Sequence, residues 1–194
     1  MSGRHASGRD LPLIAWGEAL RREAVEAARL RRRVLFWLLA FWAIVIQLIF
    51  PPAPRLVWNA SASAPVGLYF ARPGTRPEAG DMVVAWVPKP WRQLAATRHY
   101  LPENVPLVKR VVGVPRDRIC AVGPTITVDG RRVATRAAID GQGRPMPWRR
   151  GCRVLGRDEY FLLMEGVAAS FDGRYFGVTG ASDLVGKAYP LWTR

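Results

Sequence analysis

The chain has 194 residues, 49% of them hydrophobic, which suffices for one core of ordinary size and a membrane anchor but argues against a second large domain. Its net charge of +14 is typical of nucleic-acid-binding proteins, yet the basic residues are dispersed, with no zinc-finger spacing, no RNA-binding signature and no isolated basic helix beyond Arg29–Arg33. Attraction to anionic lipid headgroups therefore explains the charge better than nucleic acid does, and no nucleic-acid partner is expected.

The N-terminal part contains one hydrophobic segment, from Val34 to Phe50, with no charged residue. At about 1.5 Å per residue, a helix of this length reaches about 25 Å, the short end of what spans a bilayer. Pro51 and Pro52 follow and would end the helix. We therefore predict a single transmembrane helix over residues 34–50.

The charges on either side of this segment predict its orientation. Arginines crowd its N-terminal side, at Arg29 and Arg31–Arg33, whereas only Arg55 lies close on the other side. The positive-inside rule then places the N-terminus in the cytoplasm. This predicts a partly helical cytoplasmic tail at residues 1–33 and an exported domain at residues 51–194.

A cleaved signal peptide is the competing interpretation, because a basic region, an apolar region and the small residues Ala60-Ser61-Ala62 fit its outline. The apolar segment is longer than a typical signal core, however, and the small residues lie ten positions beyond its end. The composition of Asp10–Arg33 favours a helix that either extends the membrane helix or forms a solvated amphipathic tail. Asn59-Ala60-Ser61 also matches a glycosylation acceptor, a short motif that arises often by chance.

Short β-branched segments separated by Gly, Pro and Asp predict a mainly antiparallel β domain beyond Pro54. Asp129-Gly130 is a strong two-residue hairpin signal, because both turn positions need positive φ. One helix is predicted at Trp91–Arg98. The Pro-rich connection around Val87–Trp91 and Leu101–Pro102 carries aromatic residues that either contact the membrane interface or form a plain surface loop. The predicted strands are Val66–Phe70, Met82–Val87, Leu107–Val114, Thr125–Val128, Arg131–Ala134, Glu159–Met164 and Leu184–Leu191.

Cys120 and Cys152 are the only two cysteines. An exported domain lies in an oxidising compartment, where the two thiols can pair, and the alternative is two unpaired buried thiols. No metal site is expected, because the cysteines lack histidine partners at ligand spacing.

Lys109 is one of three lysines in a chain with 26 arginines, and it lies within the apolar segment Leu107–Val112. Lysine loses its proton when buried, whereas arginine effectively does not. Burial on a strand would lower the lysine pKa from about 10.4 to about 7, which leaves a neutral amine able to act as a base. The alternative without a catalytic role is a strand lysine whose ammonium group reaches solvent.

Serines at Ser61 and Ser63 lie in a turn-prone segment, and a hydroxyl nucleophile needs a base within hydrogen-bonding reach. The two histidines are His5 in the tail and His99 in a loop, so a Ser/His/Asp triad would depend entirely on His99. A serine with a deprotonatable lysine therefore predicts a Ser/Lys hydrolase, although a small-residue linker is the simpler reading of the two serines.

Four segments in order resemble sequence boxes of one family. They are Ser63-Ala64-Pro65-Val66-Gly67-Leu68-Tyr69, Gly80-Asp81-Met82-Val83-Val84, Tyr100-Leu101-Pro102 leading to Val105–Pro115, and Ser170-Phe171-Asp172-Gly173-Arg174-Tyr175-Phe176-Gly177. Together they are similar to the TraF-type conjugative-transfer peptidases, a branch of the signal peptidase I family. The departures are Arg116, where the family usually has glycine, and Gly173, where it often has serine.

This resemblance implies a role for each matching residue. Ser63 would be the nucleophile, Lys109 the general base, and Ser61 a hydroxyl that helps the Ser63 N–H hold the oxyanion. Ser170 matches a serine that orients the lysine. Asp172 and Arg174 match a structural ion pair.

The resemblance also implies a fold and a function. We expect an antiparallel, barrel-like signal peptidase catalytic domain with one N-terminal transmembrane helix, at the outer face of a bacterial inner membrane. The enzyme would be a serine endopeptidase that needs no cofactor and processes an exported preprotein such as a pilin precursor. The alternatives are a housekeeping signal peptidase I and a non-catalytic component of a conjugative transfer apparatus, and the presence of both Ser63 and Lys109 argues against the second.

Overall fold

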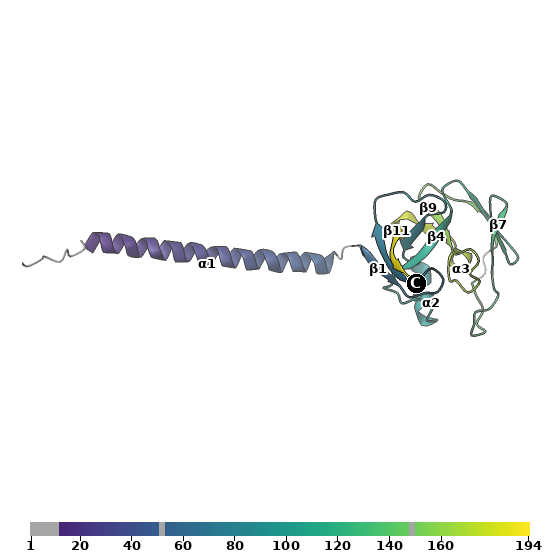
Figure 1. Cartoon of the computed structure of the whole chain (residues 1–194), viewed down its shortest axis with the longest axis horizontal. Coiled ribbons are helices and arrows are strands. Elements are labelled where there is room, and N and C mark those ends of the chain that lie inside the picture. The colour runs from purple at the N-terminus through teal and green to yellow at the C-terminus, as the bar shows by residue number, and fades with distance from the viewer. Residues whose placement is uncertain (1–11, 51–52, 148–149) are drawn as a thin grey trace, which may run out of the picture. The chain divides into compact units, whose positions relative to one another are not determined.

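The computed structural model describes residues 12–50, 53–147 and 150–194 of the chain (Figure 1). It divides into two compact units, Met1–Pro52 and Ala53–Arg194. His5 lies outside the described residues.

The first unit is one long helix, α1 (Pro12–Ile49). Its section Leu20–Ile49 is long and apolar enough to cross a membrane, and no part of the most apolar stretch is buried against protein. Large apolar side chains such as Trp37 and Leu48 are exposed along this section. The helix also covers residues 12–33 of the predicted tail, as a continuous extension of the apolar part, and the first eleven residues lie outside the described part of the chain.

The second unit is mainly β, as predicted, and all its strand pairs are antiparallel. Seven strands form a curled sheet in the order β1-β2-β11-β3-β4-β9-β10, and four form a smaller sheet in the order β7-β6-β5-β8 (Figure 1). The large sheet consists of β1 (Leu56–Asn59), β2 (Gly67–Arg72), β3 (Met82–Ala85), β4 (Leu107–Gly113), β9 (Glu159–Leu163), β10 (Thr179–Gly180) and β11 (Leu184–Thr193). The small sheet consists of β5 (Arg118–Val122), β6 (Thr125–Val128), β7 (Arg131–Thr135) and β8 (Gly151–Val154).

Seven of these strands lie within a few residues of the predicted positions, and β1, β5, β8 and β10 were not predicted. The missed strands are short, and β8 has no buried residue that would create an alternating pattern. The predicted helix is α2 (Lys89–Thr97), which starts earlier than expected because Pro90 fits the first helical turn. A further short helix, α3 (Gly173–Phe176), and a 3₁₀ turn, η1 (Ala181–Asp183), complete the unit.

The two sheets share a core. Val112, Phe161 and Leu163 of the large sheet pack with Ile119, Ile126 and other residues of the small sheet in one cluster of buried side chains. Trp91 in α2 and Leu101 in the connection after it are half-buried and pack on a second cluster of buried side chains around Val83 and Leu162.

An exposed face that contains several aromatic residues lies on β1, β2 and β11. The strand register places Trp58, Leu68 and Trp192 in one row across these three strands, and the Trp58 and Trp192 rings stack with their centroids 5.7 Å apart. Leu56 and Tyr189 lie in the next row and are exposed. We call these five residues and Phe70 the aromatic face.

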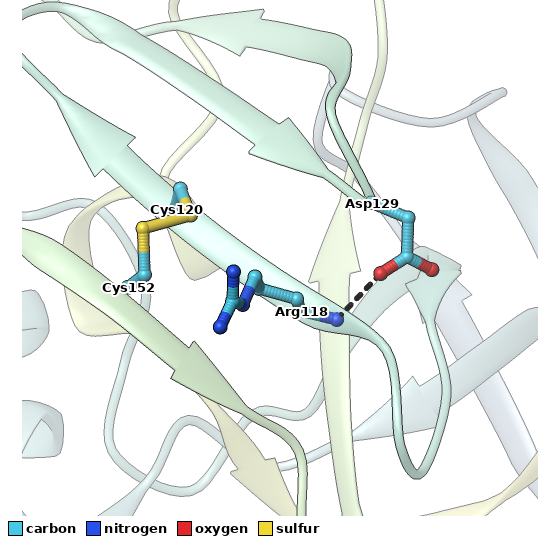
Figure 2. Close-up of a disulfide and its surroundings, with 4 residues drawn as sticks. All are labelled: Arg118, Cys120, Asp129 and Cys152. Atoms are coloured by element: carbon cyan, nitrogen blue, oxygen red, sulfur yellow. Dashed lines mark hydrogen bonds between the residues drawn. A yellow bond between two sulfur atoms is a disulfide. The ribbon is translucent and has the colours of Figure 1, made fainter.

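Cys120 and Cys152 face each other across β5 and β8 and form a disulfide (Figure 2). Beside it, Asp129 at the β6–β7 turn accepts a hydrogen bond of 2.8 Å from the backbone N–H of Arg118. Asp129 has φ 47° and Gly130 φ 81°, as the predicted two-residue hairpin requires. All four residues of β8 are exposed, so its side chains contribute little packing. The disulfide therefore provides a covalent link between β8 and the small sheet.

The two departures from the family boxes have structural explanations. Arg116 has φ 84°, a left-handed conformation that glycine adopts most easily, so the turn after β4 keeps its shape at some cost in backbone strain. Gly173 is packed so closely that a Cβ would lie 2.7 Å from the Leu162 carbonyl oxygen and 3.0 Å from the Phe161 ring. A serine at position 173 would require its neighbours to move.

We expect Gly67→Ala to destabilise the β unit, because an added Cβ would lie 2.0 Å from the backbone oxygen of Trp192. Gly74→Ala is the matched control, since Gly74 also has positive φ but nothing lies within 4 Å of its added Cβ. The control should cost about 1 kcal/mol, and Gly67→Ala at least about 2 kcal/mol more. Urea unfolding of the full chain in detergent measures both, and equal losses would contradict the steric explanation.

Candidate active site

The central strand β4 holds Lys109. This strand lies between β3 and β9 in the large sheet, and all its residues except Arg110 are buried. Lys109 is paired with Val83 and is 3% exposed. Both faces of β4 are buried, because its residues belong to clusters of buried side chains on either side of the sheet.

The loop between β1 and β2 carries Ser61 and Ser63. Asn59, 7% exposed at the end of β1, holds this loop in place: its Nδ2 donates to the carbonyl oxygens of Ser61, Ala64 and Pro65 at 3.0–3.1 Å. Its Oδ1 accepts from the Ser61 N–H at 3.2 Å. With its amide nitrogen bonded internally, Asn59 is not the exposed glycosylation acceptor that the motif suggested.

Three serine hydroxyls and the lysine amine form one connected group. Lys109 Nζ lies 2.6 Å from Ser63 Oγ and 3.0 Å from Ser170 Oγ. Ser61 Oγ lies 2.8 Å from Ser63 Oγ and also accepts from the Ser63 N–H at 3.2 Å. Residues from three distant parts of the sequence thus meet within hydrogen-bonding distance.

The environment of Lys109 favours its neutral form. Burial lowers the pKa of this amine from 10.5 to about 8, with Asp172 acting to raise the pKa and Arg174 to lower it. Because the two opposite charges nearby act against each other, loss of hydration is the dominant effect. At pH 7 about a tenth of the molecules would then carry a neutral Lys109.

Asp172 and Arg174 form a fully buried ion pair, with Arg174 Nε 2.8 Å from Asp172 Oδ1. Asp172 also accepts from the backbone N–H groups of Met164 and Arg174, and caps the short helix α3. Arg174 in turn donates to the carbonyl oxygens of Met164 and Thr135. The pair therefore joins β9, α3 and the end of β7 directly behind Ser170.

A cavity of about 580 Å³ opens at this group. Lys109 is the only charged residue among the described residues that line it, and Ser61, Ser63 and Ser170 are its hydroxyl groups. The walls are largely apolar. The remaining lining residues are Trp58, Asn59, Ala60, Tyr100, Leu101, Pro102, Val105, Pro106, Leu107, Val108, Ala169 and Phe171.

The structure brings together Ser61, Ser63, Lys109 and Ser170, with Asp172 and Arg174 packed behind them. Cys120 and Cys152 lie in the small sheet and do not line the cavity. His99 is exposed and is not among its described lining residues either. Sequence reasoning missed Asn59 as the residue that shapes the serine loop, and the available signal was a polar residue among apolar ones immediately before the Ser61–Gly67 segment.

Comparison with known proteins identifies a matching family and several relatives. The family "signal peptidase, peptidase S26" matches residues 28–192. The chain is 34% identical over 146 residues to a probable conjugal transfer protein TraF of Sinorhizobium fredii, covering 70% of this chain and 76% of that protein. It is 32% identical to conjugal transfer protein TraF of Agrobacterium fabrum and 29% identical to plasmid transfer protein TraF of Escherichia coli, covering 70% of this chain and 81% of each relative.

Among solved structures, a signal peptidase I from Enterococcus faecalis aligns at 15% identity, with 58% of this chain and 97% of that chain covered and a TM-score of 0.36. That similarity is too low to add to the argument. The family match covers most of the chain, and it includes the serine loop, the lysine strand and the Ser170–Gly177 segment. The chain therefore belongs to the signal peptidase family, peptidase S26.

Proposed function

We propose that this protein is a membrane-anchored serine endopeptidase that cuts exported preproteins, with Ser63 as nucleophile and Lys109 as general base. The observation that carries the proposal is the 2.6 Å contact between Ser63 Oγ and a buried lysine amine of lowered pKa. A base must lie within hydrogen-bonding reach of the nucleophile and must be able to accept its proton near the working pH. Both requirements are met at this contact.

In this mechanism neutral Lys109 takes the proton of Ser63 as Oγ attacks the scissile carbonyl carbon. Lys109 then gives that proton to the leaving amine as the peptide bond breaks, which leaves an acyl ester on Ser63. A water molecule attacks the ester, Lys109 takes a proton from it, and the proton returns to Ser63 Oγ as the acid product leaves. Ser170, 3.0 Å from Nζ, holds the amine toward Ser63.

The developing oxyanion would be held by the Ser63 N–H and the Ser61 hydroxyl, donors of the kind that supply several kcal/mol when preorganised. In the free protein the Ser63 N–H donates to Ser61 Oγ at 3.2 Å. The oxyanion must therefore replace Ser61 Oγ as the acceptor of this bond, and the Ser61 hydroxyl must turn to donate. The oxyanion role of Ser61 thus includes a local rearrangement on substrate binding.

The substrate that fits this proposal best is a conjugative pilin precursor, because relatives above 30% identity are named conjugal transfer proteins. An apolar cavity with a single cationic lining residue suits a neutral peptide segment. By the family resemblance, the acyl-enzyme is resolved either by water or by the pilin's own amine, which would give a cyclic product. A housekeeping signal peptidase would instead process many unrelated precursors, and a non-catalytic transfer component would process none.

We expect loss of precursor processing, by at least about a thousand-fold, in Ser63→Ala, Lys109→Ala and Lys109→Arg, because arginine cannot give up its proton. The measurement is conversion of a tagged pilin precursor co-expressed with the full chain. Matched controls are Ser182→Ala and Lys187→Arg: Ser182 is exposed, and Lys187 is bonded to Asp81 on the surface. Equal processing by wild type and the three site variants would refute the Ser/Lys mechanism, provided that all are inserted in the membrane in equal amounts.

The pH dependence of this enzyme follows from the lowered pKa of Lys109. We expect the single-turnover cleavage rate to rise with pH and to reach half its maximum near pH 8, where half of the lysine is neutral. A cleavage rate that stays constant from pH 6 to pH 9 would contradict the proposal that Lys109 is the general base.

The same pKa predicts a stability effect with a defined sign. The unfolded chain binds this proton up to about pH 10.5 and the folded chain only up to about pH 8. Protonated Lys109 therefore destabilises the fold by about 3 kcal/mol below pH 8, and this penalty fades as pH rises toward 10.5. Comparison of urea unfolding for wild type and Lys109→Met between pH 7 and pH 10 isolates the effect, since the other titrating groups are common to both.

We further propose that α1 crosses the inner membrane with the N-terminus in the cytoplasm and the β unit in the periplasm. Arginines precede the apolar segment, and the Cys120–Cys152 disulfide suits an oxidising compartment.

Only six residues separate Ile49 from β1, whose Leu56 and Trp58 belong to the aromatic face. Tryptophan and tyrosine favour the headgroup region, so this face suits lipid contact beside the site. A cut at Ala60–Ala62 would detach β1 from β2, which argues against a removed signal peptide.

The orientation predicts that a reporter enzyme active only after export will be active when fused after Arg194. The same reporter fused after Arg33, before the apolar segment, should be inactive. High activity of the second fusion together with low activity of the first would show the opposite orientation.

A further inference from the structure

The wall of the cavity contains two aromatic side chains in contact. Tyr100 and Phe171 both line the cavity, and their ring centroids lie 5.0 Å apart. Phe171 directly follows Ser170, whose hydroxyl contacts Lys109. Tyr100 lies in the connection between α2 and β4, a segment outside both sheets. An aromatic wall carried partly by a connecting segment needs additional support to keep one position.

That support comes from a hairpin formed by residues 139–146, between β7 and β8. Its ends pair at Ile139 and Pro145, and the Asp140 N–H donates to the Arg144 carbonyl oxygen at 2.9 Å. Asp140 Oδ1 accepts from the backbone N–H groups of Gln142 and Arg144 at 2.9 and 2.8 Å. Arg144 Nε donates to Asp140 Oδ2 at 2.7 Å, and the Asp140 side chain is 6% exposed.

The same carboxylate reaches the aromatic wall. The Tyr100 hydroxyl donates to Asp140 Oδ2, and it also lies 3.3 Å from the Met146 sulfur. The Arg144 guanidinium lies over the Tyr100 ring, 5.5 Å from its centroid. Tyr100 is therefore held at its hydroxyl by an anion and at its ring face by the cation that pairs with that anion.

Two further bonds join the hairpin to the backbone just before Tyr100. Arg98 Nη1 donates to the Pro145 carbonyl oxygen at 2.8 Å, and Arg144 Nη2 donates to the Arg98 carbonyl oxygen at 3.1 Å. Burial alone would raise the pKa of Asp140, but the hydrogen bonds from Tyr100 and Arg144 together hold the pKa well below its usual range. The carboxylate therefore stays ionised throughout the pH range in which Lys109 titrates.

We propose that Asp140, acting through Tyr100, is a positioning residue that fixes the Tyr100–Phe171 wall as the receiving surface for an apolar side chain of the substrate peptide. This inference rests on the proposed function, because it assigns a role within the same cavity. Asp140 does not line the cavity and Tyr100 makes no bond to Ser63 or Lys109 among the described contacts. Their removal should therefore weaken peptide binding and leave the chemistry of the Ser/Lys pair unchanged.

The test begins with binding, so that it does not depend on turnover. In the full chain with Ser63→Ala, anisotropy of a labelled peptide that spans the junction between the signal segment and mature region of the pilin precursor gives Kd. We expect Tyr100→Phe, which removes only the hydroxyl, and Asp140→Ala each to raise Kd at least five-fold. Asp140→Asn keeps an acceptor for the Tyr100 hydroxyl and should have an intermediate effect. The double variant Tyr100→Phe/Asp140→Ala should bind no more weakly than Asp140→Ala, because both changes break one connection.

The matched control is Glu165→Gln, which breaks an exposed ion pair with Arg131 outside the cavity and should leave Kd unchanged. With Ser63 present, Tyr100→Phe and Asp140→Ala should raise KM to the same extent as they raise Kd. Their kcat should stay within two-fold of wild type, and the pH of half-maximal rate should not change. Alanine substitution along the peptide should then identify one apolar position that matters for wild type and no longer matters for Tyr100→Ala.

Two results would overturn the inference. One is a Kd within two-fold of the Ser63→Ala chain for a correctly folded Tyr100→Phe variant of it. The other is a fall in kcat with KM unchanged, which a general loss of folded enzyme would produce. Failure of the proposed function has a different signature. In that case Ser63-containing wild type binds the peptide and does not cut it, while the Kd comparison still decides the role of the wall.

Discussion

The structure depends on keeping one lysine amine out of water. Lys109 lies on an interior strand of the large sheet and is almost fully buried, so hydration no longer favours its charged form. The fold bears a cost of about 3 kcal/mol for this burial at neutral pH, a large fraction of the stability of an ordinary domain. Such a cost is typical of functional sites, where a lowered lysine pKa is kept although it reduces the stability of the fold.

Each surrounding feature limits the freedom of a group that this amine contacts. Asn59 bonds to three carbonyl groups of the loop that carries Ser63, and Ser170 accepts a hydrogen bond from the amine. The buried Asp172–Arg174 pair orders the segment around Ser170 and places opposite charges near the amine, so that neither dominates its pKa. The pair is thus both a structural connection and an electrostatic neighbour of Lys109, a combination that its motif alone did not indicate.

The more distant parts of the β unit contribute to the cavity through connections rather than through catalytic groups. The small sheet packs on the large one through apolar side chains, and the disulfide attaches its exposed strand β8 (Figure 2). Between β7 and β8 the chain forms the 139–146 hairpin, which reaches back to Tyr100 at the cavity wall. A hairpin outside both sheets therefore has a direct contact with the wall of the cavity.

The sequence by itself determined the class of structure and the chemical groups. Hydrophobic length identified the apolar helix, β-branched segments and the Asp129-Gly130 turn identified most strands, and the rarity of lysine singled out Lys109, because these signals are local. The family resemblance implied that Ser63, Lys109 and Ser170 act together, but only the tertiary structure shows their contacts, the buried support from Asn59 and the bond between Tyr100 and Asp140. Those contacts join residues up to 61 positions apart in the chain, and no local pattern specifies them, since they arise only when strand order and register bring distant segments together.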